Sequence, residues 1–133
     1  MIRFVIAIFI FSVLTSCSFS HKIANKKLEK SKVILATIAH KKYKDNYRIL
    51  YNKKGDFVIV TKREKEVVKL IPDLNYFVYS MKSKSIVIED HLVAGNVYWE
   101  NNYLLKAIER EQKAESAENS YSFDVKNKIY MLN

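Results

Sequence analysis

Cysteine, proline and glycine are scarce in this sequence, and each scarcity excludes a class of protein. The 133 residues include one Cys, one Pro and two Gly. A single Cys forms no internal disulfide and cannot build a Cys-rich zinc site. Two Gly are too few for a Gly-rich phosphate-binding loop, and so little Pro and Gly excludes collagen-like chains and flexible linkers.

The rest of the composition is that of one folded domain with a basic surface. Hydrophobic residues make up 49% of the chain and aromatic residues 13%, which is too apolar for general disorder. A length of 133 residues suits a single domain. Lys and Arg outnumber Asp and Glu by 23 to 14, so the formal net charge is +9.

The first twenty residues have the pattern of an export signal. Arg3 is their only charge, a largely apolar stretch follows at residues 4–14, and small residues precede Cys17. These are the three regions of a secretory signal peptide. As a helix the apolar stretch is about 16 Å long, half the hydrocarbon thickness of a bilayer. It is therefore too short to span a membrane permanently.

The segment Leu14-Thr15-Ser16-Cys17 resembles the lipobox of bacterial lipoproteins, in which Leu and two small residues precede an obligatory Cys. In that family a peptidase cuts just before the Cys, whose sulfur carries a diacylglyceryl group. The resemblance implies cleavage between Ser16 and Cys17 and lipidation of Cys17. It also implies the membrane as a partner, because two or more acyl chains anchor a protein stably.

Residues just after the Cys indicate the destination by the same resemblance. Ser18 stands where enteric-type lipoproteins retained in the inner membrane have Asp. Residues 18–22 also lack the acidic residues that direct the lipoproteins of some lineages to the cell surface. We therefore expect an outer-membrane protein that faces the periplasm.

Three parts are expected: a signal peptide at 1–16, a lipidated polar tether at 17–32 and a single β-rich domain at 33–133. Residues 33–38 open the domain as either a buried strand or part of one helical stripe. Periodicity does not separate the two over so short a stretch. Their β-branched content favours a strand.

From residue 47 onward, short stretches rich in aromatic and β-branched residues alternate with turn signals. Gly55 suits a hairpin loop, Asn101-Asn102 suits a two-residue turn, and Pro72-Asp73 stops a strand. Residues 90–96 are an expected loop, and 109–119 are a long loop or a short helix. We predict a mainly β fold, a small antiparallel meander arranged as a sandwich, curved sheet or barrel. The expected strands are 47–51, 57–61, 66–71, 76–80, 85–89, 97–100, 103–108, 121–126 and 129–132.

A basic, tyrosine-containing stretch at residues 41–65 is the main candidate binding surface. Such a stretch suggests nucleic acid in the cytoplasm, but for an exported protein we expect anionic lipid or another envelope protein. Only four of the 23 basic residues are Arg, the residue favoured at phosphate sites, so a merely solvated basic face is the alternative. The candidate contacts are Lys41, Lys42, Lys44, Arg48, Lys53, Lys54, Lys62 and Arg63.

The sequence contains no catalytic or metal-binding motif. His21, His40 and His91 are far apart, and no HExxH pattern occurs. Asp90 beside His91 fits a turn better than a catalytic pair, because adjacent residues of a strand point to opposite faces. No Cys nucleophile remains once Cys17 is lipidated. We therefore expect no cofactor, no metal ion and no enzymatic activity.

Six aromatic residues are candidates for either a ligand groove or the core: Tyr76, Phe77, Tyr79, Tyr98, Trp99 and Tyr103. A small domain without a disulfide depends on such side chains, since each buries about 150–250 Å². We expect core packing to account for most of them. Tyr98 and Trp99 are adjacent and face opposite sides, so at most one belongs to the core if one face is buried.

Taken together, the patterns predict a membrane-anchored lipoprotein whose β domain binds or assembles with another envelope component without catalysis. An inhibitor or immunity-type lipoprotein is the alternative, and a cell-wall-acting enzyme is a weaker one.

The resemblance is tested by replacing the lipidated residue. A Cys17→Ala variant lacks the sulfur that forms the thioether, so we expect it to stay uncut and without lipid. The measurement is the intact mass of protein extracted into detergent. The wild-type mass should equal residues 17–133 plus two or three acyl chains, and normal maturation of the variant would contradict the lipobox.

Overall fold

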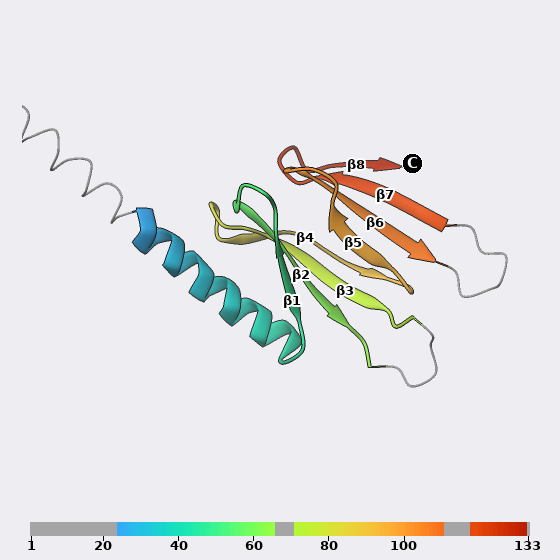
Figure 1. Ribbon diagram of the computed structural model, residues 1–133, viewed down its shortest axis with the longest axis horizontal. Coiled ribbons are helices and arrows are strands. Elements are labelled where there is room, and N and C mark those ends of the chain that lie inside the picture. Colours follow the sequence, from blue (N-terminus) through green and yellow to red (C-terminus); the bar gives the residue numbers. More distant parts are fainter. Residues whose placement is uncertain (1–23, 66–70, 111–117, 133) are drawn as a thin grey trace, which may run out of the picture.

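The computed structural model describes residues 24–65, 71–110 and 118–132 (Figure 1). The signal segment, the cleavage site and Cys17 lie outside these residues, so the resemblance at 14–17 stays a prediction. Nearly all of the expected strand at 66–71 also lies outside them, as do residues 111–117 of the expected loop or helix.

Within the described ranges, eight strands form two four-stranded antiparallel sheets, each a meander in chain order. Sheet A consists of β1 (Arg48–Tyr51), β2 (Phe57–Arg63), β3 (Leu74–Ser80) and β4 (Ser85–Leu92). Sheet B consists of β5 (Asn96–Trp99), β6 (Leu104–Arg110), β7 (Glu118–Asp124) and β8 (Ile129–Leu132). The sheets share one core and form a sandwich, which confirms the predicted mainly β, antiparallel meander (Figure 1).

Several loop boundaries differ from the expected ones. The expected loop or helix at 109–119 is shorter, because β6 runs on to Arg110 and β7 begins at Glu118, and β7 ends at Asp124, two residues earlier than expected. β4 runs on to Leu92, so Asp90 and His91 lie in a strand and not in a turn. The Asn101-Asn102 hairpin is also wrong in length, because four residues separate β5 from β6. In this loop the Asn101 side chain, and not a left-handed backbone, stabilises the turn. Its Oδ1 accepts hydrogen bonds from the N–H groups of Tyr103 and Leu104, both at 2.9 Å. By contrast, Gly55 has a φ of 72° in the β1–β2 hairpin, as expected.

A helix at residues 24–43 precedes the strands, so the preference for a strand at 33–38 is wrong. Its buried side chains, Ser31, Leu35 and Ala39, are four residues apart and form one stripe against sheet A. Packing of this stripe outweighs the weak helix propensity of β-branched residues. The helix begins within the segment expected to be a polar tether, and residues 24–30 are exposed.

Sheet A is the middle of three layers (Figure 1). The helix covers one of its faces, where Val58, Val60, Phe77 and Tyr79 are buried. The other face packs on sheet B, where Ile59, Tyr76 and Val78 meet Val97, Leu105 and Phe123. β3 is therefore buried on both faces, and four consecutive residues, 76–79, have no exposed surface.

The aromatic residues follow this layering. Tyr76, Phe77 and Tyr79 are in the core, as expected. Tyr98 is 39% exposed on the outer face of sheet B, whereas Trp99 packs against the inner core. The prediction that these two neighbours face opposite sides is confirmed.

One chain segment, residues 93–95, carries the chain from sheet A to sheet B. Ala94 has a φ of 46° there, and Gly95 lies against its neighbours. A Cβ at Gly95 would be 2.4 Å from Leu92 Cβ and 2.7 Å from the carbonyl oxygen of Ile108. The crossing therefore requires a residue without a side chain at this position.

Two substitutions on the same helix test the layer arrangement. Leu35 is 1% exposed and Val33 is 65% exposed. Leu35→Ala leaves a cavity between the helix and sheet A, so we expect the free energy of unfolding to fall by about 2–5 kcal/mol. Val33→Ala should change it by less than about 0.5 kcal/mol. Urea unfolding followed by Trp99 fluorescence measures both, and equal effects would mean that the helix does not pack on the sheet.

Candidate functional site

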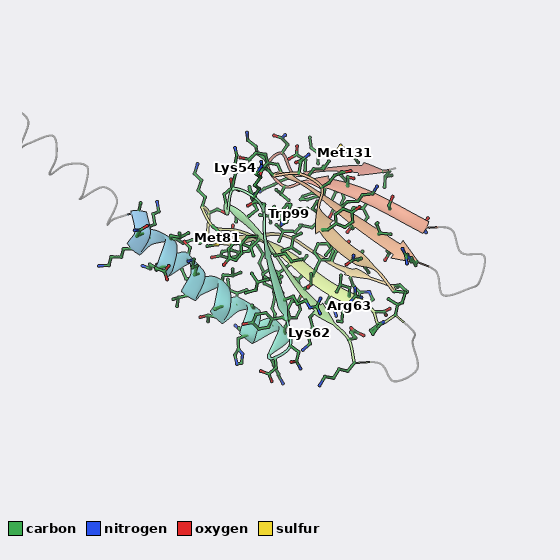
Figure 2. All side chains as sticks on the ribbon, viewed as in Figure 1. Lys54, Lys62, Arg63, Met81, Trp99 and Met131 are labelled. Atoms are coloured by element: carbon green, nitrogen blue, oxygen red, sulfur yellow. The ribbon has the colours of Figure 1, made fainter. Side chains whose placement is uncertain are left out.

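The eight predicted basic contacts do not form one surface, and several have structural roles. Lys42 Nζ lies 2.6 Å from the Glu89 carboxylate, which ties the helix to β4. Lys54 donates a hydrogen bond to the Tyr103 hydroxyl at 3.2 Å, and its Nζ lies 5.2 Å from the centre of that ring. That hydrogen bond raises the pKa of Lys54. Figure 2 shows Lys54 at the opposite end of the sheet from Lys62 and Arg63.

Lys62 and Arg63 bind backbone carbonyl groups. Lys62 Nζ donates to the carbonyl oxygens of Tyr43, at 3.3 Å, and Asp45, where the helix ends. The last carbonyls of a helix have no partner within it and attract cations, so Lys62 stabilises this end. The Arg63 guanidinium donates to the carbonyls of Pro72 and Gly95, at 3.2 and 3.1 Å.

Three of the predicted residues nevertheless meet at one groove. Arg48, Lys62 and Arg63 line a cavity of about 530 Å³ between the start of β1, the end of β2 and the start of β5, together with Lys65. Lys41 instead lines an open, mostly apolar hollow beside His40 and Tyr47, and Lys44 and Lys53 are exposed. An anionic group in the groove would face a local excess of positive charge.

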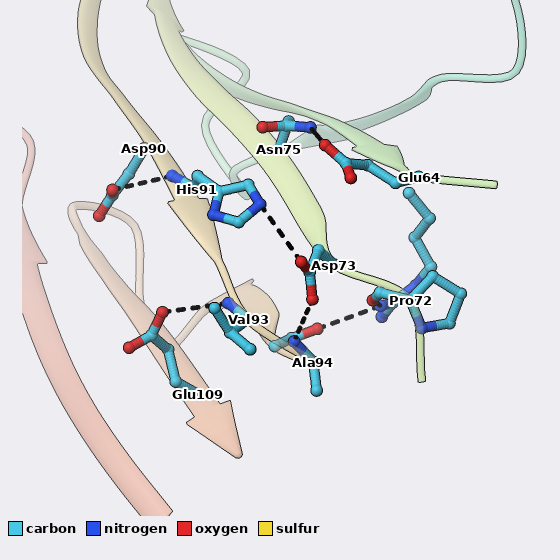
Figure 3. A network of polar contacts seen from close by, with 11 residues as sticks. Glu64, Pro72, Asp73, Asn75, Asp90, His91, Val93, Ala94 and Glu109 are labelled. Atoms are coloured by element: carbon cyan, nitrogen blue, oxygen red, sulfur yellow. Dashed lines mark hydrogen bonds and ion pairs between the residues drawn. The ribbon is translucent and has the colours of Figure 1, made fainter. Parts of the chain in front are cut away.

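Beside this groove lies a cluster that the sequence did not reveal (Figure 3). Glu64 follows β2, Asp73 precedes β3 and His91 lies in β4, and one ligand atom from each lies within 4.8 Å of the others. The His91 Nε2 atom is 3.6 Å from Asp73 Oδ2. Asp73 is 6% exposed, which is unusual for a carboxylate unless it is paired.

Backbone and amide donors orient both carboxylates. Asp73 Oδ1 accepts the N–H of Ala94 at 3.0 Å, which links the cluster to the crossing between the sheets. Glu64 Oε1 accepts a hydrogen bond from Asn75 Nδ2 at 2.9 Å, and the Glu64 N–H donates to the Asp73 carbonyl at 2.9 Å. Local motif searches miss this cluster because strand pairing, and not sequence spacing, brings the three residues together.

A second group of polar residues, linked by hydrogen bonds, joins the two sheets inside the sandwich. The hydroxyls of Tyr76 on β3 and Tyr121 on β7 are 2.6 Å apart, and Tyr121 donates to Asp90 Oδ2 on β4. Burial, then the hydrogen bond to Asp90, raises the pKa of Tyr121 above the usual tyrosine range. Burial also raises the pKa of Tyr76, against the opposing effect of its bond to Tyr121.

β8 is one of the two edge strands of sheet B, and its four side chains are apolar and exposed. Their exposed fractions are 55% for Ile129, 56% for Tyr130, 40% for Met131 and 89% for Leu132. The Tyr130 ring packs against two rings of β7. Its centre lies 4.7 Å from that of Phe123 and 5.7 Å from that of Tyr121. The sequence predicted this strand but not its position at an edge.

No family model, no curated protein and no solved structure matches the chain. Among the described residues, no helix is both long and apolar enough to cross a membrane. What the domain does must therefore be inferred from its own residues and their geometry.

Because burial raises the pKa of Tyr76 and Tyr121, we expect the free energy of unfolding to fall at high pH. The fold favours their neutral forms, so their contribution is present below the usual tyrosine pKa of about 10 and is lost as the pH rises above it. Tyr121→Phe removes one partner from Tyr76 and from Asp90, so we expect the free energy of unfolding at pH 7 to fall by about 1–3 kcal/mol. Above pH 10, the free energy of unfolding should fall less steeply with pH in this variant than in the wild type.

Urea unfolding at several pH values measures both effects. Tyr98→Phe is the matched control, because Tyr98 lies on the outer face of sheet B. It should follow the wild type. Equal stability of the Tyr121→Phe variant would show that the chain of hydroxyls contributes nothing.

Proposed function

We propose that the chain is a bacterial lipoprotein, anchored through Cys17 to the periplasmic face of the outer membrane. Its β domain binds an extended segment of another envelope protein, without catalysis. Support for the anchor comes from the segment Leu14-Thr15-Ser16-Cys17. Support for the binding role comes from one observation: β8 is an apolar, exposed edge strand, and β7 is the one described strand that pairs with it.

The edge of β8 has the features of a strand-addition site. A sheet edge presents unpaired backbone groups to which another chain can add a strand. Proteins usually protect such edges with charged residues, Pro or a covering element. β8 contains no charge and no Pro, and no described strand pairs with it beyond β7.

The side chains of β8 indicate what such a segment contains. Strand register places Tyr130 and Leu132 on the inner face opposite Phe123 and Tyr121, so Ile129 and Met131 face outward. A partner strand therefore meets apolar neighbours on both faces. Lys126 and Lys128 precede β8, so carboxylates at the nearby end of the partner segment would complete the match.

The anchor leaves this edge accessible. Six residues lie between Cys17 and residue 24, where the described helix begins, and the seven steps from one Cα to the next reach at most about 25 Å. The first turns of the helix carry exposed Lys26, Lys27 and Lys30, which suit a surface of anionic head groups. In Figure 1 the described start of the helix lies at the left and β8 lies right of centre in sheet B, with sheet A between them.

Charge on the edge should abolish binding. In cells that make the full chain, a membrane-permeable cross-linker joins it to its partner, and we expect a discrete adduct. Ile129→Lys with Leu132→Lys changes two side chains that are more than half exposed, so the fold tolerates both. The adduct should decrease by at least about tenfold, because a desolvated Lys opposes strand addition.

The matched control is Val33→Lys with Val93→Lys, two exposed apolar residues away from β8. It should keep the adduct, and both variants should keep the lipidated mass. An adduct that survives in the β8 variant, or that disappears in both, would refute strand addition at β8. Loss of lipid in the wild type would refute the anchor independently.

A further inference from the structure

Glu64, Asp73 and His91 present three ligand atoms toward one point at the open ends of β2, β3 and β4 (Figure 3). We propose that they bind a divalent transition-metal ion. Around a tetrahedral ion with bonds of about 2.0–2.2 Å, ligand atoms are roughly 3.4 Å apart. Asp73 Oδ2 and His91 Nε2, at 3.6 Å, already have this spacing. One carboxylate oxygen of the half-buried Glu64 lies within 4.8 Å of both and supplies the third ligand.

Two features of the surroundings separate this cluster from a chance group of polar side chains. First, antiparallel pairing fixes the backbone: Asn75 of β3 is directly opposite His91 of β4, and Glu64 donates its N–H to Asp73. Second, each carboxylate has one oxygen held by a donor, the Ala94 N–H for Asp73 and the Asn75 amide for Glu64. Partners of this kind orient carboxylate ligands in metal sites.

The donor set selects the ion. One imidazole nitrogen and two carboxylate oxygens suit Zn²⁺ or Mn²⁺, whereas Ca²⁺ requires six to eight oxygen ligands. Three protein ligands leave a coordination position for water or for a further group. The His91 side chain is 45% exposed, so that position opens toward solvent. A doubly positive ion would also balance two carboxylates that face each other at close range.

The site has a structural consequence when filled. It would join the ends of three strands of sheet A at the place where Asp73 holds Ala94 in the crossing to sheet B. An ion that binds the folded state alone raises its stability by an amount that grows with the logarithm of the ion concentration divided by the dissociation constant. Zn²⁺ should therefore raise the melting temperature as well as bind.

Calorimetric titration of Zn²⁺ into the EDTA-treated full chain in detergent tests this. Every protein carries Cys17→Ser, so that no thiol competes for the ion. We expect one Zn²⁺ per chain and an increase in melting temperature. His91→Gln and Glu64→Gln should each weaken binding by at least about tenfold, as loss of a ligand or its support does at such sites.

His40→Gln is the matched control, because His40 is an exposed imidazole on the helix, far from the cluster in sequence. It should bind Zn²⁺ like the parent protein. Absence of binding, or equal binding by the His91→Gln and parent proteins, would overturn the proposal. A loss of stability in His91→Gln that is the same with and without Zn²⁺ would identify an ion pair between His91 and Asp73 and would equally overturn it.

Discussion

The whole structure depends on the burial of β3 on both of its faces. A β-strand points alternate side chains in opposite directions, so complete burial of residues 76–79 needs a covering layer on each side. The helix supplies one layer and sheet B supplies the other. Neither cover is dispensable, because removal of either exposes large aromatic side chains of sheet A to water.

This constraint explains why the strands could be predicted better than the helix. Alternation and turn residues are local, and all eight strands of sheets A and B overlap with expected ranges. β4 is longer than expected because Asp90 and His91 are polar residues held within the sandwich and its rim. Residues 33–38 form a helix because they must cover sheet A, and the helical stripe in their sequence was too short to outweigh their β-branched content.

The candidate sites could not be predicted for the same reason. Lys62 looked like a free cation in the sequence, but the helix end that it stabilises is nearly twenty residues away. Glu64, Asp73 and His91 are brought together by the register of three strands. Residues at large separations in the sequence reveal such a cluster only once the strand pairing is known. The resemblance of residues 14–17 to a lipobox, by contrast, can be seen in the sequence because a lipobox is a local pattern.

The single crossing at residues 93–95 has a consequence for the order of folding. Every described strand pair joins neighbours in the chain, so the pairing within each sheet consists of local contacts that can form before the two sheets dock and stabilise each other. Docking of the sheets is then the non-local step. During synthesis the N-terminal half of the chain emerges first. Sheet A is therefore complete while Ile59, Tyr76 and Val78 are still exposed to water. Until β5, β6 and β7 dock on it, that face of sheet A can make non-native contacts. The second half of the chain is what covers it.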